Sequence, residues 1–540
     1  MNSATPGGRE GARSALLCAL PAMALAAVLL LPFLNSPFTI DDPVFLREAQ
    51  HAAIDPLHPG AFDFVWAFDV KRRFSEIVVG GLAASYFLLP TALTGSREWV
   101  GHLCQIAYLC AALWSVALVA LRLGLSRSEA RWTALLVGSG PAVLGMAATV
   151  MPDIPAMLCV TVGVERVLAW RERRRWHAAA LAVLCLSVAA LTRLHTILVL
   201  APAFILLLDG IGPGEIRASF RSFPLRFLPL AATPIVVFAA STLMADPDSV
   251  SEDFFSSVFD LKRGLMLPAH NAAALLVHWL FAVPLTIPWL VARFRMIPPA
   301  WLWIPALVAS VASIRLGWPA FAAAAALVVM ADIVWDAIRR RDRVQLALWL
   351  WLWLAIPVII YVQLPPKYLL PCAPAAAMLI VRLVRRGSEA RARWLVPALT
   401  AYGAILGVLI VLGVRDLGEI QRRAVTELIV PHVQKGERVW FAGDWGFHWY
   451  AERAGAEPAT VEPPMPLPGD IIVISQISFP PFGHSKFAHE VLQTVVYPGN
   501  GISRVMDMRT GVGFFSNPYG YLPWGWGSGD ANRFEIWRAE

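Results

Sequence analysis

The chain has 540 residues, of which 57% are hydrophobic and only 15% are charged. Soluble domains average roughly 45–50% apolar and about 25% charged residues, so this composition excludes an ordinary soluble protein and indicates a chain that crosses a membrane many times. The formal net charge is +7. A nucleic-acid surface needs a continuous basic stripe with interleaved polar residues. The sequence contains no such stripe, so we expect no nucleic-acid partner.

Apolar stretches long enough to cross a hydrocarbon core of about 30 Å recur along the whole chain, and they predict a polytopic α-helical fold with about thirteen transmembrane helices. The predicted spans are residues 14–34, 100–121, 132–150, 154–170, 177–192, 195–209, 227–244, 273–291, 300–314, 319–335, 344–363, 368–384 and 394–414. Residues 177–209 could instead form one broken hairpin. The first span is too long for the apolar core of a signal peptide and precedes no clear cleavage site, so we expect it to be retained.

Arginines crowd every second connection between these spans, as in the segments 171–175 and 339–343. Cytoplasmic loops of membrane proteins carry such an excess of Lys and Arg. The pattern predicts an integral plasma (inner) membrane protein whose N-terminus is cytoplasmic. With an odd number of spans, the C-terminal segment lies outside. The net positive charge is therefore mostly a consequence of topology.

Three regions carry polar residues on the outer side. Residues 35–99 form a long first outer loop, in which the weaker apolar stretch 77–93 is predicted to be a helix at the membrane interface. Residues 245–272 form a second, acidic outer loop. We assign residues 1–414 to a transmembrane domain and residues 415–540 to a C-terminal extracytoplasmic domain, which is long enough to fold as a small unit.

The C-terminal domain mixes helical and strand patterns, which predicts an α/β or α+β domain. An amphipathic helix is expected over 416–434 and a second helix over 446–454, with strands at 438–442, 470–475, 492–497 and 533–538. The segment 517–529, NPYGYLPWGWGSG, is rich in turn residues and aromatics. It is either an ordinary surface loop with a packed tryptophan, or a lid or stacking platform for a sugar.

Familiar cofactor motifs are absent from the sequence. There is no Walker A loop, dinucleotide-binding glycine motif, HExxH, EF-hand or GxSxG pattern. The cysteines lie inside or beside apolar spans, at Cys18, Cys104, Cys110, Cys159, Cys185 and Cys372. We therefore expect no disulfide framework, no metal-binding pair and no cofactor. No ligand spacing demands a divalent cation, although a cation between Asp41, Asp153 and a histidine stays open.

A few charged residues stand at the ends of apolar spans, where a charge at bilayer depth is costly and is therefore a functional candidate. The acidic pair Asp41 and Asp42 follows the first span, and Asp153 lies between prolines in a short turn. Arg193, two residues before His195, lies between two apolar runs. Each has a structural alternative. The pair could be a solvated helix end, Asp153 a helix N-cap and Arg193 an arginine that snorkels to the headgroups.

Lys367 is a further candidate, because a lysine at an outer loop end opposes the distribution of positive charge elsewhere in the chain. It stands with Tyr368 in the proline-rich segment QLPPKYLLPCAP. Together these residues predict an outward-facing chamber with carboxylates and cations. The cations suit a phosphate group and the carboxylates suit activation of a hydroxyl, which indicates a lipid-phosphate substrate.

These motifs resemble the GT-C superfamily of polytopic glycosyltransferases, and most of all the branch of protein O-mannosyltransferases and lipid A aminoarabinose transferases. The matching segments are FTIDDPVFL with Asp41 and Asp42, MPDIPAM with Asp153, LTRLH with Arg193, and KYLLPCAP with Lys367 and Tyr368. Asp42 stands where the family usually has glutamate. The segment KRRFSEIVV lies roughly where the family has a Lys-Pro-Pro-Leu element, which adds Arg72 and Arg73 to the candidate donor-binding residues.

The resemblance implies an inverting transferase that moves a sugar from a polyprenyl-phosphate carrier to an extracytoplasmic lipid, glycan or protein. Asp41 would be the general base, with Asp42 raising the pKa of one member of the pair. Arg193 and Lys367 would stabilise the leaving phosphate, and Asp153 would orient the acceptor, the sugar or a cation. The alternatives are a transporter or flippase of lipid-linked or soluble sugars, a non-catalytic relative, and a ligase that moves whole oligosaccharides.

Overall fold

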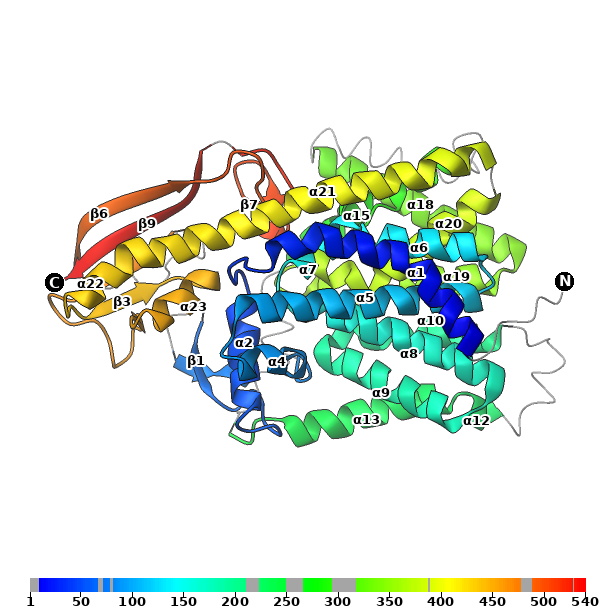
Figure 1. Ribbon diagram of the computed structural model, residues 1–540, viewed down its shortest axis with the longest axis horizontal. Coiled ribbons are helices and arrows are strands. Elements are labelled where there is room, and N and C mark those ends of the chain that lie inside the picture. The colour runs from blue at the N-terminus through cyan, green and yellow to red at the C-terminus, as the bar shows by residue number, and fades with distance from the viewer. Residues whose placement is uncertain are drawn as a thin grey trace.

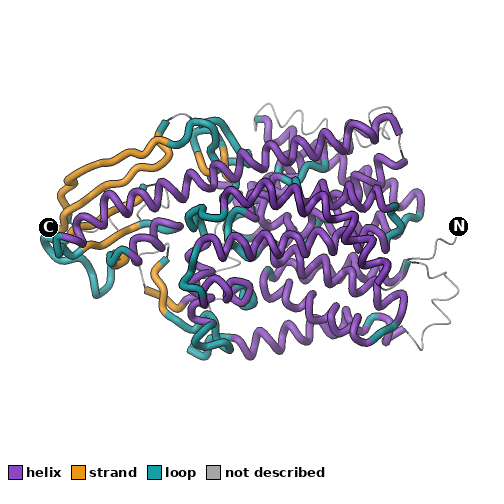
Figure 2. Tube along the Cα trace, viewed as in Figure 1, coloured by secondary structure: helices purple, strands orange, loops and turns teal. Residues whose placement is uncertain are grey.

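The strands of the protein gather at one end of a bundle of long helices (Figures 1 and 2). The computed structural model describes residues 9–66, 71–77, 81–209, 223–248, 266–293, 317–386, 389–476, 488–527 and 529–540. The first helix, α1 (Arg9–Leu30), begins at the end of the bundle away from the strands. The predicted fold class, a polytopic helical membrane protein with a C-terminal sheet-containing domain, is confirmed.

The bundle contains both long spans and shorter, broken helices. After α1, its helices are α5 (Glu98–Arg122), α6 (Arg127–Gly138), α7 (Pro141–Ala147), α8 (Asp153–Arg173), α9 (Trp176–Thr192), α10 (Leu200–Leu208), α12 (Phe223–Arg226), α13 (Leu228–Met244), α15 (Met266–Phe281), α16 (Thr286–Arg293), α18 (Trp318–Arg340), α19 (Arg343–Trp351), α20 (Ala373–Arg386) and α21 (Glu389–Ala424). Short 3-10 helices add η3 (Leu194–Val199), η8 (Ile356–Ile360) and η9 (Pro366–Cys372).

The predicted count of about thirteen spans is not confirmed. Six helices of the described residues are long and apolar enough to cross a membrane, and a seventh arises if α15 and α16, bent by 60° at their break, act as one span. The predicted span 132–150 is divided into α6 and α7. Proline explains both breaks, because Pro141 and Pro284 cannot donate a backbone hydrogen bond within a helix. The predicted span 300–314 lies outside the described residues.

The described residues of the segment 35–99, which we predicted to be the first outer loop, fold into short elements between the bundle and the sheet (Figure 1). Helix α2 (Asp42–Ala52) packs against the 3-10 helix η2 (Ser85–Leu88) and α4 (Leu89–Leu93). Strands β1 (Asp63–Val65) and β2 (Lys71–Arg73) pair antiparallel, and the short α3 (Phe74–Ile77) follows them. The stretch 77–93 was predicted to be one interfacial helix. Its second half forms two short helices, η2 and α4, and neither is long enough to cross a bilayer.

Helix α21 joins the bundle to the C-terminal domain without a break. Its 36 residues continue through a π-helical turn (Val425–Ile429) into α22 (Val430–Gln434). The boundary expected at residue 414 therefore falls inside one helix, and the segment predicted as a separate helix over 416–434 is its continuation. No proline lies between Pro397 and Pro431, so nothing in the backbone stops the helix there.

The C-terminal domain is built on a mixed five-stranded sheet in the order β4-β3-β5-β9-β6. Its strands are β3 (Val439–Ala442), β4 (Glu457–Pro458), β5 (Ile471–Ser475), β6 (His489–Pro498) and β9 (Asp530–Ala539), and helix α23 (Trp445–Arg453) follows β3. Strand β3 runs parallel to β4 and β5, whereas β9 runs antiparallel to β5 and β6. A small hairpin, β7 (Met506–Asp507) and β8 (Val512–Gly513), lies beside α21. The predicted helix 446–454 and all four predicted strands coincide with these elements.

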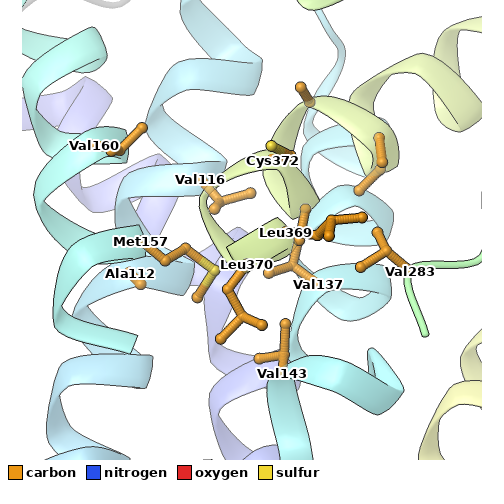
Figure 3. Close-up of a cluster of buried hydrophobic side chains, with 14 of the residues drawn as sticks. Ala112, Val116, Val137, Val143, Met157, Val160, Val283, Leu369, Leu370 and Cys372 are labelled. Carbon is orange, nitrogen blue, oxygen red and sulfur yellow. The ribbon is translucent and has the colours of Figure 1, made fainter. Parts of the chain in front are cut away.

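An apolar cluster fixes the 3-10 helix η9 inside the bundle. Leu369, Leu370 and Cys372 of η9 lie among side chains of α5, α6, α7 and α8, including Val116, Val137, Val143 and Met157 (Figure 3). Leu369, Leu370 and Cys372 are completely buried. The residues that directly precede this anchor, Lys367 and Tyr368, are therefore held at a defined position.

Glycines let α21 pack closely against the bundle. A Cβ atom on Gly403 would lie 2.5 Å from the carbonyl oxygen of Ser139, and one on Gly407 would lie 2.5 Å from Leu144 Cδ1. Residues four apart share one helix face, and pairs of small residues at this spacing allow membrane helices to approach closely. The contact of α21 with α7, and with Ser139 between α6 and α7, therefore depends on these two glycines.

We predict that Gly403→Ala destabilises the protein by about 1–3 kcal/mol, because the new methyl group meets a backbone carbonyl that cannot move aside. The measurement is the thermal unfolding midpoint in detergent. The matched control is Ile405→Ala on the same helix, since Ile405 is 64% exposed on the outer face of the bundle. Equal midpoints for the Gly403 variant and the wild type would contradict the close contact.

Candidate active site

A strained turn places the acidic pair at the start of α2. Ile40 has a φ of 48°, which is a rare backbone conformation for a β-branched residue and typical of functional sites. Asp41 is the N-cap of α2 and Asp42 its first residue. The turn therefore directs the two neighbouring carboxylates to different surroundings.

Asp42 is completely buried and stabilises the backbone around it. Its Oδ2 accepts a hydrogen bond of 2.9 Å from the Thr39 N–H, and its Oδ1 accepts one of 2.9 Å from the Val150 N–H. Burial raises the pKa of Asp42 to about 8, although both backbone hydrogen bonds oppose the shift. Asp42 thus ties the start of α2 to the connection between α7 and α8, and it presents no open face to a substrate.

Asp41 is partly exposed and forms an ion pair with Lys367. Lys367 Nζ donates to Asp41 Oδ2 over 2.8 Å, with 4% of the lysine side chain and 29% of the aspartate side chain exposed. The Lys367 ammonium also lies 5.7 Å from the centre of the Tyr368 ring. A buried ammonium needs a counter-charge. Here that charge comes from a residue far away in the sequence.

Asp153 and Arg193 form a second, bidentate pair. Arg193 Nε donates to Asp153 Oδ1 over 3.0 Å and Nη2 donates to Oδ2 over 2.9 Å. The alternative role of Asp153 as an N-cap is not observed, because Pro152 occupies the N-cap of α8 without a side-chain hydrogen bond. Arg193 lies in extended backbone between α9 and η3, with its side chain 13% exposed. It is therefore held by a carboxylate and is largely buried in the protein.

Tyr368 joins the two pairs into one site. The Arg193 guanidinium carbon lies 5.5 Å from the Tyr368 ring centre and 5.4 Å from that of Phe45 on α2. Electrostatic interactions also link Arg193 to Asp41. The structure thus brings together Asp41, Asp153, Arg193, Lys367 and Tyr368, with Asp42 directly behind Asp41.

Arg72 and Arg73 lie on strand β2, and the partners of Arg73 among the described residues lie outside this cluster. Arg73 pairs with Asp246 through bonds of 2.9 and 2.8 Å and approaches Asp63 at 3.7 Å. Arg72 lies opposite Phe64 in the β1-β2 register. Arg73 therefore links the first outer loop to the residues that follow α13. The expected role of Arg72 and Arg73 in donor binding stays a prediction.

Glu48 on α2 is a site residue that our sequence analysis missed. It is 3% exposed, and its Oε2 atom has no hydrogen-bond partner among the described residues. Burial raises the pKa of Glu48 to about 8, while the nearby Arg193 guanidinium lowers it. A signal for it was present, because Asp41, Phe45 and Glu48 are spaced by four and three residues and so share one helix face. His195 Nε2 is likewise buried without a partner in the part of the chain that the structure describes.

We predict that Glu48→Gln reduces the loss of stability at alkaline pH. The pKa of Glu48 is raised from 4.5 to about 8 in the folded protein, so the folded state binds the proton more tightly than the unfolded state. The wild type therefore loses stability as pH rises from the ordinary pKa through the folded pKa. The glutamine has no proton to lose.

The measurement is the unfolding midpoint at about pH 5 and about pH 9 for both proteins. The wild type should lose several degrees more than the variant. Asp42 titrates in the same window and should leave part of the slope in place. An unchanged slope in Glu48→Gln would contradict a buried, titrating Glu48.

The aromatic segment 517–529 begins with Asn517, which holds the backbone shortly before Lys367 by hydrogen bonds. Asn517 is completely buried, and its Oδ1 accepts a 2.7 Å hydrogen bond from the Leu364 N–H, three residues before Lys367. Its Nδ2 donates to Asn271 Oδ1 over 2.9 Å, and Asn271 in turn donates to the carbonyls of Ile359 and Tyr361. The start of the segment is thus neither an ordinary surface loop nor an exposed platform.

We predict that Asn517→Ala loosens the backbone before Lys367, because the Leu364 N–H loses its acceptor. Amide hydrogen exchange at Leu364 should become at least about tenfold faster, which corresponds to about 1.4 kcal/mol. Exchange in strand β5 should stay unchanged, because Asn517 does not contribute to the sheet. Unchanged exchange at Leu364 would contradict the clamp.

The two carboxylates considered as metal ligands, those of Asp41 and Asp153, are both paired with cations. Asp41 is engaged by Lys367, and Asp153 by Arg193. Within the described ranges, no group of three or more His, Cys, Asp or Glu side chains is placed to hold a metal ion. The expectation of no cofactor stays a prediction.

Comparisons with known proteins give only distant likenesses. No family model and no curated protein matches the chain. Among solved structures, it is similar to ArnT from Cupriavidus metallidurans bound to undecaprenyl phosphate, with 12% identity, a TM-score of 0.46 and coverage of 88% of this chain and 95% of that chain. The apo state of ArnT gives a TM-score of 0.43 at the same identity and coverage.

The chain is also similar to the arabinofuranosyltransferase AftD from Mycobacteria, with 14% identity and a TM-score of 0.41. That match covers 97% of this chain but only 40% of AftD. Both proteins belong to the GT-C superfamily that the sequence motifs resemble. Since all these TM-scores lie below 0.5, the likeness is too distant to assign a role to any residue of this chain.

Proposed function

We propose that this protein is a membrane glycosyltransferase that transfers a sugar from a polyprenyl-phosphate carrier to an extracytoplasmic acceptor. The observation that carries the proposal is the pair of Asp41 and Lys367, an accessible carboxylate bonded over 2.8 Å to a buried ammonium. Beside this pair lies the guanidinium of Arg193. A carboxylate and two cations in one cluster suit a reaction in which a hydroxyl loses a proton while a phosphate leaves.

Asp41 is the general base of the proposed reaction. When the donor phosphate binds, it competes with Asp41 for the Lys367 ammonium and frees the carboxylate to accept the proton of the acceptor hydroxyl. The hydroxyl oxygen then attacks the anomeric carbon from the side opposite the phosphate. The bond between that carbon and the phosphate oxygen breaks, its electron pair leaves with the phosphate, and the anomeric configuration inverts.

Arg193 stabilises the leaving phosphate, and Asp153 is its positioning residue. Asp153 occupies Nε and Nη2 of the guanidinium, which leaves the N–H groups of Nη1 for a phosphate oxygen. A bidentate carboxylate fixes the plane of the guanidinium, so its remaining donors point in one direction. The resemblance implied that Asp153 orients the acceptor, the sugar or a cation. Here we propose only that it positions Arg193.

The distribution of charge supports an outward-facing site. The span Glu10–Phe33 ends shortly before Asp41, on the side of the bundle that carries the sheet domain (Figure 1). At the opposite end, arginines of α16, α18 and α20 surround Asp336 and Asp342, with Arg340 2.8 Å from Asp336 and Arg382 2.7 Å from Asp342. The excess of arginine at that end is typical of a cytoplasmic face.

We predict that Asp41→Asn lowers sugar transfer by at least about 100-fold, because an amide cannot accept the proton of the acceptor hydroxyl. The assay measures release of polyprenyl phosphate by the purified protein in lipid nanodiscs, using a panel of polyprenyl-phosphate sugars and acceptors. The matched control is Asp55→Asn, since Asp55 lies in the same loop and, among the described residues, accepts hydrogen bonds from Leu57 and His58, two and three residues further on.

Three outcomes separate the proposal from its alternatives. Loss of transfer in Asp41→Asn, with a normal Asp55 variant, supports the base. Normal transfer by Asp41→Asn removes Asp41 from catalysis. Movement of intact lipid-linked sugar across proteoliposomes, without release of the carrier phosphate, would identify a flippase instead.

A further inference from the structure

A cavity separate from the active site lies between the first outer loop and the C-terminal domain. Its volume is about 350 Å³, and it is lined by Asn35, Phe38, Gly95, Ser96, Arg97, Glu98, Trp99, Trp449, Tyr450 and Arg453. We call it the rim cavity. It shares no lining residue with the cluster of Asp41, Lys367, Arg193 and Asp153. The turn from Phe38 to Asp41 lies between the two sites.

The rim cavity carries an excess of positive charge. In the described part of the chain, neither Arg97 nor Arg453 has a carboxylate partner, and Arg453 lies 5.2 Å from the Trp449 ring centre. The one acid of the lining, Glu98, is already engaged by Arg422 at 3.2 Å and by the hydroxyl of Tyr450. Two guanidiniums are thus left to face the cavity, and a guanidinium matches the geometry of a phosphate group.

The start of α5 adds hydrogen-bond donors to the same wall. Arg97 is the N-cap of α5 and makes no side-chain capping bond. The N–H groups at a helix start have no acceptor within the helix and attract an anion. The cavity and its two arginines are the primary observation, and the helix start reinforces them.

The position of the rim cavity corresponds to the level of lipid headgroups. Two predicted membrane crossings end at it, because the span Glu10–Phe33 stops just before Asn35 and the span Glu98–Arg122 begins at Glu98. Trp99 is 43% exposed and Leu103, one turn further into the span, is 43% exposed. Exposed tryptophan next to exposed leucine is typical of the boundary between headgroups and hydrocarbon.

We propose that the rim cavity binds a phosphate monoester group, carried by an anionic lipid headgroup or supplied as free phosphate, through Arg97 and Arg453. The indole of Trp449 forms one apolar wall, and Arg47 lies 5.3 Å from the same ring. This binding site is independent of sugar transfer. It would seat a phosphate-bearing lipid beside the first outer loop without contacting Asp41.

The test measures binding by native mass spectrometry of the full chain released from neutral detergent. The probes are phosphatidic acid, dioleoylglycerol as the same lipid without phosphate, and inorganic phosphate as competitor. The variant is Arg97→Gln with Arg453→Gln. The control is Arg423→Gln, which removes another exposed charge, one that is paired with Glu427 outside the cavity.

Wild type should bind phosphatidic acid and not dioleoylglycerol, and the double variant should bind it about tenfold more weakly, as expected for two exposed charge contacts. Arg423→Gln should bind like wild type. Replacement of both arginines by lysine should restore part of the binding. All variants alter exposed side chains, so their unfolding midpoints should match that of wild type.

The competitor distinguishes the two sources of the phosphate. Displacement by inorganic phosphate at similar concentration supports a free-phosphate site, and resistance to it supports a lipid headgroup. Equal binding of phosphatidic acid by wild type and the double variant would overturn the proposal. Equal binding of dioleoylglycerol and phosphatidic acid by wild type would overturn it as well. Neither result bears on sugar transfer, which Asp41→Asn tests separately.

Discussion

The buried ammonium of Lys367 is the constraint on which the site depends. A charge that is almost excluded from water is stable only beside an opposite charge. The lysine side chain is 4% exposed, and Asp41 provides that charge at 2.8 Å. For the two to meet, the turn at Ile40 and the 3-10 helix η9 must pack against one another, although 326 residues separate them in the chain. The ion pair therefore requires a particular arrangement of the first outer loop on the bundle.

Apolar packing and one polar clamp make that arrangement possible. Leu369, Leu370 and Cys372 fix η9 from the bundle side (Figure 3), and Asn517 holds the backbone before it from the side of the C-terminal domain. Charges supported in this way lie in surroundings of low dielectric constant, where each electrostatic interaction is stronger than in water. The same surroundings leave Glu48 costly to ionise, which is why its pKa is raised to about 8.

The sequence was informative where burial is costly and uninformative where it is not. Asp153, Arg193 and Lys367 could be identified because a charge at the end of an apolar span must find a partner. Glu48 escaped notice because a charge on a short amphipathic helix is usually solvated. Asn517 carries no charge and lies in a segment rich in turns, so nothing marked it as a clamp. The number of spans differed because Pro141 and Pro284 break helices that hydropathy alone predicts to be continuous. The domain boundary differed because α21 continues without interruption past residue 414, where composition alone had placed it.

The two ion pairs of the site differ in their number of hydrogen bonds and in their exposure to solvent. Asp153 and Arg193 make two hydrogen bonds, and the aspartate side chain is 2% exposed. Breaking that pair would leave a buried charge without a partner, at a cost of about 3–5 kcal/mol. Asp41 and Lys367 share one hydrogen bond, and 29% of the aspartate side chain reaches solvent. If a phosphate replaces Asp41 as the partner of Lys367, the Asp41 carboxylate remains in contact with water. Neither charge is then left buried without a partner. In the proposed reaction, the pair that can open at low cost is therefore the one whose carboxylate acts as the base. The pair that stays closed directs the Arg193 guanidinium at the phosphate of the donor.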